Sequence, residues 1–191
     1  GLVAVRTRCP PLLGVRRLDR DDPTECTSFN AAVIEYLSRS PGVTDVVLAA
    51  RWALAAEGLR YGHEPGATML LADAESSATS PAENRPVFAR SLRESVATLR
   101  ELDKHVWIVA SVPEVGWNVP SVLAPSMRFG QPPPSAPSLA QFAARQAFVV
   151  GNSIVAVNQY QCGGIEAVVG GRGGGGEVLI ERNEIRGSDF D

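Results

Sequence analysis

The sequence predicts an α/β fold in which helices flank a parallel sheet. Two apolar runs rich in β-branched residues, 43–50 and 106–112, have the composition of buried parallel strands. Segments with apolar residues at helical spacing lie before, between and after these runs, and this alternation of strand and helix is typical of a parallel sheet. The 191 residues are enough for one domain with a sizeable core.

The first half of the chain opens with a short alternating segment at 2–6, which predicts a strand. After a loop rich in Pro, Arg and Asp, Thr24 provides an N-cap for a helix that ends before Pro41. The strand at 43–50 follows, and a helical segment at 53–60 comes directly after it. A loop rich in small residues completes this half.

The second half begins with a helix whose capping signal starts at Ser80, and the strand at 106–112 follows it. A Pro-rich stretch then leads to Ser138, which caps a last helix that runs through Phe148. Residues 153–157 predict one more strand. The sequence has no internal repeat of the kind that would indicate a solenoid or a propeller.

Composition excludes several classes of function. The net charge of −3 gives no general attraction to nucleic acid or to an anionic membrane. No apolar run approaches the roughly 20 residues that cross a bilayer. The start of the chain lacks the pattern of a signal peptide, and we expect a chain cut from something longer. The cysteines and histidines lack the spacing of a zinc site, so no metal site is predicted.

Two cysteines, Cys9 and Cys26, leave two interpretations open. A disulfide between them would close a loop of about 18 residues and contribute roughly 3 kcal/mol in the chain-entropy model. That bond needs an oxidising compartment. The alternative is a pair of free thiols in a cytosolic protein, and Cys162 is left over in either case.

Arg51 and Trp52 come directly after the predicted strand at 43–50. Open α/β sheets bind ligands outside the carboxyl ends of their strands, so these two side chains are candidate ligand-binding residues. An Arg at such a place can hold a carboxylate or phosphate with two parallel hydrogen bonds, and an indole can stack on a sugar ring. The alternative is structural, with Trp52 in the core and Arg51 paired with a carboxylate.

Four motifs in order extend this interpretation: they occupy residues 9–15, 26–30, 46–53 and 112–120. Over about residues 1–150 they make the chain resemble the SGNH-hydrolase-like domain fused behind the membrane acyltransferase-3 domain. That arrangement is found in bacterial O-acyltransferases of the O-antigen acetylase type.

The resemblance implies a three-layer α/β sandwich with a parallel sheet, SGNH- or flavodoxin-like, which we expect to be incomplete at both ends. Residues 1–158 would form this partial domain, and residues 159–191 would be a Gly-rich tail that is disordered or the product of a coding frameshift. The resemblance also implies that Cys9 and Cys26 form a disulfide. Substrate-binding residues would be Arg51, Trp52, Glu114 and Trp117.

The implied activity is transfer of an acetyl group to hydroxyls of a cell-surface polysaccharide such as lipopolysaccharide. The implied place is the periplasmic or extracytoplasmic face of a bacterial inner membrane, with the acyltransferase-3 membrane domain as partner, no nucleic acid and no cofactor of the domain's own. The membrane domain would supply the acetyl donor. In ordinary SGNH hydrolases an Asn in a Gly-x-Asn-Asp motif stabilises the oxyanion, and this sequence has Arg51 and Trp52 at the corresponding place.

Two catalytic motifs of the family are missing from these 191 residues: Gly-Asp-Ser, which holds the nucleophile, and Asp-x-x-His, which holds the base. A serine nucleophile needs a base to take its proton, so we expect the chain to be inactive alone. A fragment of a stand-alone SGNH esterase and a non-catalytic carbohydrate-binding remnant are the alternatives.

Overall fold

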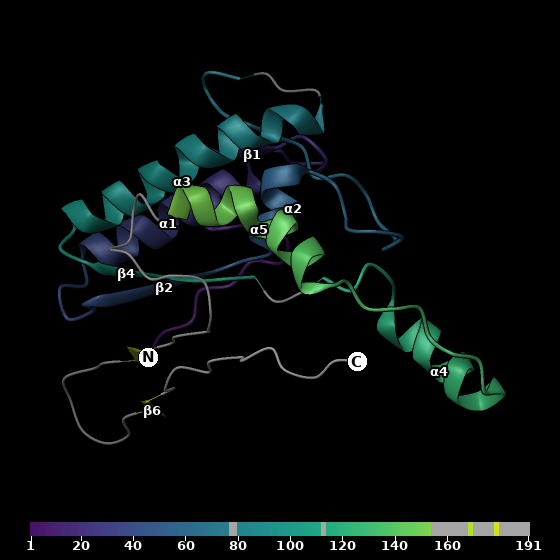
Figure 1. Cartoon of the computed structure of the whole chain (residues 1–191). Coiled ribbons are helices and arrows are strands. Elements are labelled where there is room, and N and C mark those ends of the chain that lie inside the picture. Colours follow the sequence, from purple (N-terminus) through teal and green to yellow (C-terminus); the bar gives the residue numbers. More distant parts are fainter. Residues whose placement is uncertain (77–79, 112–113, 154–167, 170–177, 180–191) are drawn as a thin grey trace.

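The computed structural model of the chain describes residues 1–76, 80–111, 114–153, 168–169 and 178–179 (Figure 1). In chain order the elements are β1 (Arg16–Arg17), α1 (Glu25–Ser38), β2 (Asp45–Ala49), α2 (Trp52–Glu57), β3 (Leu71–Ala72), the 3-10 helix η1 (Pro81–Glu83), α3 (Asn84–Glu101), β4 (His105–Val109), α4 (Val119–Phe129), α5 (Leu139–Ser153), β5 (Val168–Val169) and β6 (Val178–Leu179).

The centre of the fold is a parallel pair of strands, β2 and β4. Asp45 pairs with His105 and Ala49 with Val109, so the two strands start and end together. The connection between them contains α2 and α3, which is the strand–helix–strand unit that parallel pairing requires. The prediction of an α/β fold with these two strands in parallel is therefore confirmed.

Helices α1 and α3 lie on the same side of this strand pair (Figure 1). Leu48 of β2 is 7% exposed and belongs to one apolar cluster with Leu37 of α1 and Leu99 of α3. On the opposite face Val47 is 42% exposed. Among the described residues, one helical layer thus covers one face of the strand pair, and the three-layer sandwich is not observed.

The N-terminal segment differs from the prediction. Residues 2–6 form no strand, and Val3 is 83% exposed. Alternation alone does not hold a strand, which needs a partner for its backbone groups. The strand in this part of the chain is β1, whose Arg16 pairs antiparallel with Ala72 of β3.

The disulfide between Cys9 and Cys26 is present, and their Cα atoms are 5.2 Å apart. It ties the N-terminal loop to α1. Asn30, one turn further along α1 and buried, donates to the carbonyl oxygens of Pro10 at 2.9 Å and Leu12 at 3.0 Å. The pairing that the resemblance implied is confirmed.

Helix ends agree with the sequence in part. Thr24 precedes α1, but its hydroxyl donates to Asp22 at 2.7 Å and does not cap the helix. Ser138 precedes α5 and forms a capping box with Gln141: the Ser138 amide donates to the Gln141 side chain at 2.8 Å, and the Ser138 hydroxyl accepts from the Gln141 amide at 3.3 Å.

The region after Phe148 was predicted differently. Helix α5 continues to Ser153, which was expected to start a strand. The rest of that expected strand, to residue 157, lies outside the described residues, as does nearly all of the Gly-rich tail. Within the tail only β5 and β6 are described, and they pair antiparallel.

Helix α4 was not predicted, and it contains two prolines, Pro120 and Pro125. Pro120 occupies the first turn, where a missing N–H costs nothing, and the Asn118 side chain caps the helix by accepting from the amide of Ser121 at 3.0 Å. The helix extends away from the strand pair and has no buried residue (Figure 1). No helix in the described part of the chain combines the length and apolarity that a membrane span requires.

Candidate functional site

A cavity of about 600 Å³ lies at the carboxyl ends of β2 and β4. In open parallel sheets this edge is the usual place for a ligand. Small apolar side chains form much of its wall, and polar residues enter from three loops. The lining residues are Ala49, Ala50, Arg51, Glu64, Val109, Ala110, Ser111, Glu114, Val115, Gly116 and Trp117.

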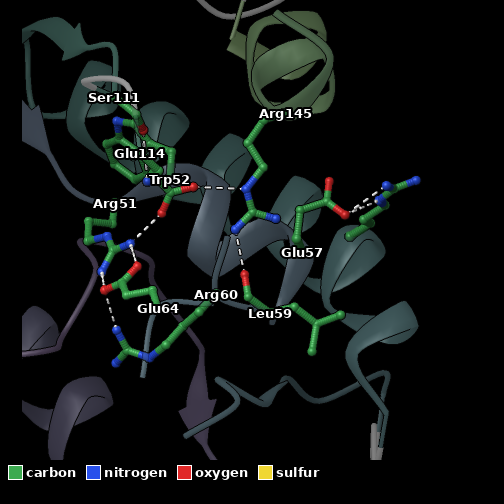
Figure 2. Close-up of polar contacts among 10 residues, drawn as sticks. Arg51, Trp52, Glu57, Leu59, Arg60, Glu64, Ser111, Glu114 and Arg145 are labelled. Carbon is green, nitrogen blue, oxygen red and sulfur yellow. Dashed lines mark hydrogen bonds and ion pairs between the residues drawn. The ribbon is translucent and has the colours of Figure 1, made fainter. Parts of the chain in front are cut away.

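Arg51 follows β2 by two residues, lines the cavity, and pairs with two carboxylates (Figure 2). Its Nη1 and Nη2 donate to the two carboxylate oxygens of Glu64, at 2.8 and 2.7 Å, which is a two-pronged ion pair. Its Nη2 also donates to Glu114. Arg51 therefore pairs with carboxylates of the protein itself, as in the structural alternative that the sequence left open.

The ion pairs continue on both sides and form a chain of five charges (Figure 2). Arg60 Nη1 lies 2.7 Å from Glu64 Oε1, and Arg145 Nε lies 2.8 Å from Glu114 Oε2. Arg145 comes from α5 and also donates to the carbonyl oxygen of Leu59. We call these five residues, Arg60, Glu64, Arg51, Glu114 and Arg145, the ion-pair chain.

Burial decides which members of the ion-pair chain a ligand can meet. The side chain of Arg51 is 45% exposed, whereas those of Glu64 and Glu114 are 21% and 7% exposed. Arg145 is 12% exposed and lies over the ring of Tyr61, 5.9 Å from its centroid. The guanidinium of Arg51 is thus the most accessible charge at the cavity.

Two glycines hold the loops that carry the carboxylates. Gly62 and Gly116 have positive φ angles of 57° and 82° and lie against each other. The amide of His63 donates to the Gly116 carbonyl oxygen at 2.7 Å. A Cβ atom on Gly62 would lie 3.0 Å from that oxygen, so the close approach needs glycine. This contact places Glu64 and Glu114 on either side of Arg51.

The ion pairs favour the charged forms of Arg51 and Glu64. Hydrogen bonds from Arg51 lower the pKa of Glu64 below its ordinary value. Hydrogen bonds to Glu64, and then those to Glu114, raise the pKa of Arg51 above its ordinary value. The charged side chains among the lining residues are one arginine, Arg51, and two glutamates, Glu64 and Glu114.

Trp52 is not part of the cavity, and this corrects its assignment as a substrate-binding residue. It is 0% exposed, and its Nε1 donates to the carbonyl oxygen of Val109 at 2.7 Å. Its ring meets Phe88 of α3 edge to face, with centroids 6.2 Å apart. Trp52 is the first residue of α2, so the chain has already turned from the sheet edge toward the core.

Trp117 and Glu114 do lie at the cavity with Arg51. The Nε1 of Trp117 is buried and has no hydrogen-bond partner. Ser111 also lines the cavity, and its hydroxyl accepts from the Trp52 amide at 3.2 Å. Neither histidine is among the lining residues, and in the described part of the chain no three His, Cys, Asp or Glu side chains form a metal-binding group.

Sequence reasoning missed Glu64, Arg60 and Arg145. Glu64 is 13 residues from Arg51, Arg145 is 31 residues from Glu114, and no local spacing links them. The available signal was an Arg at a strand end, which needs a carboxylate partner somewhere in the chain. The (i, i+4) spacing of Arg60 and Glu64 was a second, weaker signal.

A family model described as "SGNH domain (fused to AT3 domains)" matches residues 1–164. No curated protein and no solved structure matches the chain. The match includes β2, β4, the cavity and every member of the ion-pair chain.

Proposed function

Because the chain belongs to the family of SGNH domains that are fused to AT3 domains, we propose that it works within an envelope O-acyltransferase. In this proposal the SGNH domain receives an acetyl group and passes it to a hydroxyl of a cell-surface polysaccharide such as lipopolysaccharide. The family match over residues 1–164 is the observation that carries the proposal.

The cavity at the ends of β2 and β4 would hold the acceptor sugar. Its size is within the range of small-molecule sites, and it combines small apolar residues with a few polar groups, as such sites do. Arg51, Glu114 and Trp117 would contact the sugar. Arg51 would also be a charged donor for a developing oxyanion, whereas Trp52 is enclosed in the core and would not contact it.

The nucleophile and its base would come from segments other than these 191 residues, because Gly-Asp-Ser and Asp-x-x-His do not occur in them. In the complete domain, further elements would cover the face of the sheet that carries Val47 and give the three-layer sandwich. We further propose that residues 1–158 are the part of this chain that belongs to the domain.

The proposed place is the periplasmic or extracytoplasmic face of a bacterial inner membrane, with the AT3 domain as the source of the acetyl donor and no cofactor held by this domain. The disulfide between Cys9 and Cys26 supports this, because such bonds form and persist in oxidising compartments.

One alternative has an observation in its favour. The cavity has a mostly apolar wall with a few charged groups, but the Ser111 hydroxyl accepts from the Trp52 amide and no histidine lines the cavity. A domain that binds carbohydrate without catalysing a reaction would have these features too.

Deletion of the gene that encodes the chain tests the proposal. The O-acetyl content of the purified cell-surface polysaccharide is measured by proton NMR before and after deletion and after return of the gene. An acyltransferase predicts loss of one set of acetyl signals and their return. A rise in acetyl signals would indicate an esterase, and no change would refute both activities.

A further inference from the structure

The charges at the cavity disfavour an acidic ligand. Arg51 is its one cationic lining residue, and both terminal nitrogens of its guanidinium already donate to carboxylates. A ligand carboxylate would have to displace Glu64 or Glu114 from Arg51. Those two carboxylates also pair with the other two arginines of the ion-pair chain. The acidic sugar that a strand-tip Arg suggests from sequence is therefore a poor fit to the site as it is built.

The unpaired polar atoms point to a ligand that offers acceptors. In the described part of the chain, three buried side-chain atoms lack a hydrogen-bond partner: Arg60 Nε, Trp117 Nε1 and Gln146 Nε2. All three are N–H donors. Arg60 belongs to the ion-pair chain, Gln146 follows Arg145, and Trp117 lines the cavity itself. Buried donors without partners are rare, so this concentration of them needs an explanation.

Resting on the proposed function, we infer that the cavity binds an uncharged sugar, with one ligand oxygen accepting a hydrogen bond from Trp117 Nε1. The hydroxyls of that sugar donate to the carboxylates of Glu64 and Glu114, whose oxygens keep some acceptor capacity beyond their pairing with the three arginines of the ion-pair chain. Ala49 and Val109, small apolar residues of the wall, face the C–H groups of the ring. Trp117 is half-buried and its Nε1 is closed to solvent, so the indole turns slightly when the ligand binds.

The three indoles of the chain provide the test. Trp52 Nε1 donates to Val109 at 2.7 Å, Trp107 Nε1 donates to Asp45 at 3.0 Å, and Trp117 Nε1 is unpaired. A ¹⁵N–¹H correlation spectrum of the labelled 191-residue chain resolves three indole signals. The variant Trp117→Phe identifies one of them by its loss and keeps an aromatic ring in place.

The probes are maltotriose, a neutral trisaccharide, and trigalacturonate, an acidic one of similar size. We expect maltotriose to move the Trp117 indole signal downfield and to leave those of Trp52 and Trp107 in place. Affinity for trigalacturonate should be at least roughly tenfold weaker, because its carboxylates would have to displace Glu64 and Glu114 from Arg51. Trp117→Phe should weaken maltotriose binding about fivefold, the effect of one neutral hydrogen bond.

Unchanged Trp52 and Trp107 signals in Trp117→Phe show that the variant is folded. Equal or tighter binding of trigalacturonate, or binding that leaves the Trp117 signal in place, would overturn the inference and leave the proposed sugar-directed activity standing. If neither trisaccharide shifts any signal of a cavity residue, the inference fails, while the gene deletion described above still decides whether the protein is an acyltransferase.

Discussion

Replacement of Trp52 separates its role in the core from a role in ligand binding. Trp52 is 0% exposed, its Nε1 donates to the Val109 carbonyl, and its ring meets Phe88 edge to face. Trp52→Phe keeps an aromatic ring and leaves that carbonyl without its donor. Loss of a partner for a buried group costs about 1–3 kcal/mol, so we expect this variant to lose about 2 kcal/mol of unfolding free energy.

Trp52→Ala removes the ring as well. Large aromatic-to-alanine changes in cores cost about 3–5 kcal/mol, and an unpaired carbonyl adds about 1 kcal/mol, so the expected loss is about 4–6 kcal/mol. Because natural domains have about 5–15 kcal/mol of stability in all, this variant should be close to unfolded.

The assay is urea unfolding followed by far-ultraviolet circular dichroism, since the substitutions change the fluorescence. The matched control is Trp117→Phe, which removes an N–H that has no partner and should change the unfolding free energy by less than about 0.5 kcal/mol. If Trp52→Phe is as stable as the unmodified chain and Trp52→Ala loses under about 1 kcal/mol, Trp52 is not a core residue and its reassignment is wrong.

Three further predictions concern the ion pairs, the disulfide and catalysis. The pKa of Glu64 in the folded chain lies below its ordinary value of 4.5, so ionised Glu64 stabilises the folded state. That stabilisation is complete above about pH 5 and is lost as the pH falls and Glu64 takes up a proton. The urea midpoint of Glu64→Gln should therefore fall less steeply between about pH 5 and 3 than that of the unmodified chain. Parallel curves for the two proteins would contradict this. Replacing Cys9 and Cys26 by Ala should lower the unfolding free energy by about 3 kcal/mol. Reductant should lower the melting temperature of the unmodified chain and leave that of the double variant unchanged. An unmodified chain whose melting temperature does not change with reductant would show that the disulfide is not formed. The 191-residue chain should hydrolyse p-nitrophenyl acetate no faster than buffer, and turnover that Ser111→Ala abolishes would refute this.

The central strand pair could be predicted from the sequence because its signals are local. Two β-branched apolar runs with a helical segment between them leave parallel pairing as the natural arrangement, and β2 and β4 pair in that way. The segment at 2–6 has a local pattern that predicts a strand, but no strand pairs with it in the described structure. The prediction of a strand there was therefore wrong. Helix α4 was not predicted. Pro120 lies in its first turn, where proline is tolerated, and Pro125 lies inside it.

The site could be predicted only in part, because its geometry depends on residues distant in sequence. The position of Arg51 followed from the end of a strand, and Glu114 from the end of the next. Their connection through Glu64 depends on the close contact of Gly62 with Gly116, which no spacing reveals. For Trp52 the sequence left a core position and a site position open, because it does not show that α2 begins at that residue and turns the indole inward.

The proposal that the cavity of this SGNH domain acts in O-acyl transfer is tested most directly with Arg51→Ala in the full-length parent protein. The measurement is the initial rate at which membranes carrying that protein move labelled acetyl groups onto purified polysaccharide of the source cells. Arg85→Ala is the control, since Arg85 is also an exposed arginine paired with a carboxylate, Glu57, outside the cavity. At equal protein levels, we predict a fall of at least about tenfold for Arg51→Ala, about 1.4 kcal/mol of transition-state stabilisation, and a change below about twofold for the control. Equal rates for the two variants would contradict the assignment of the cavity as the site of acyl transfer.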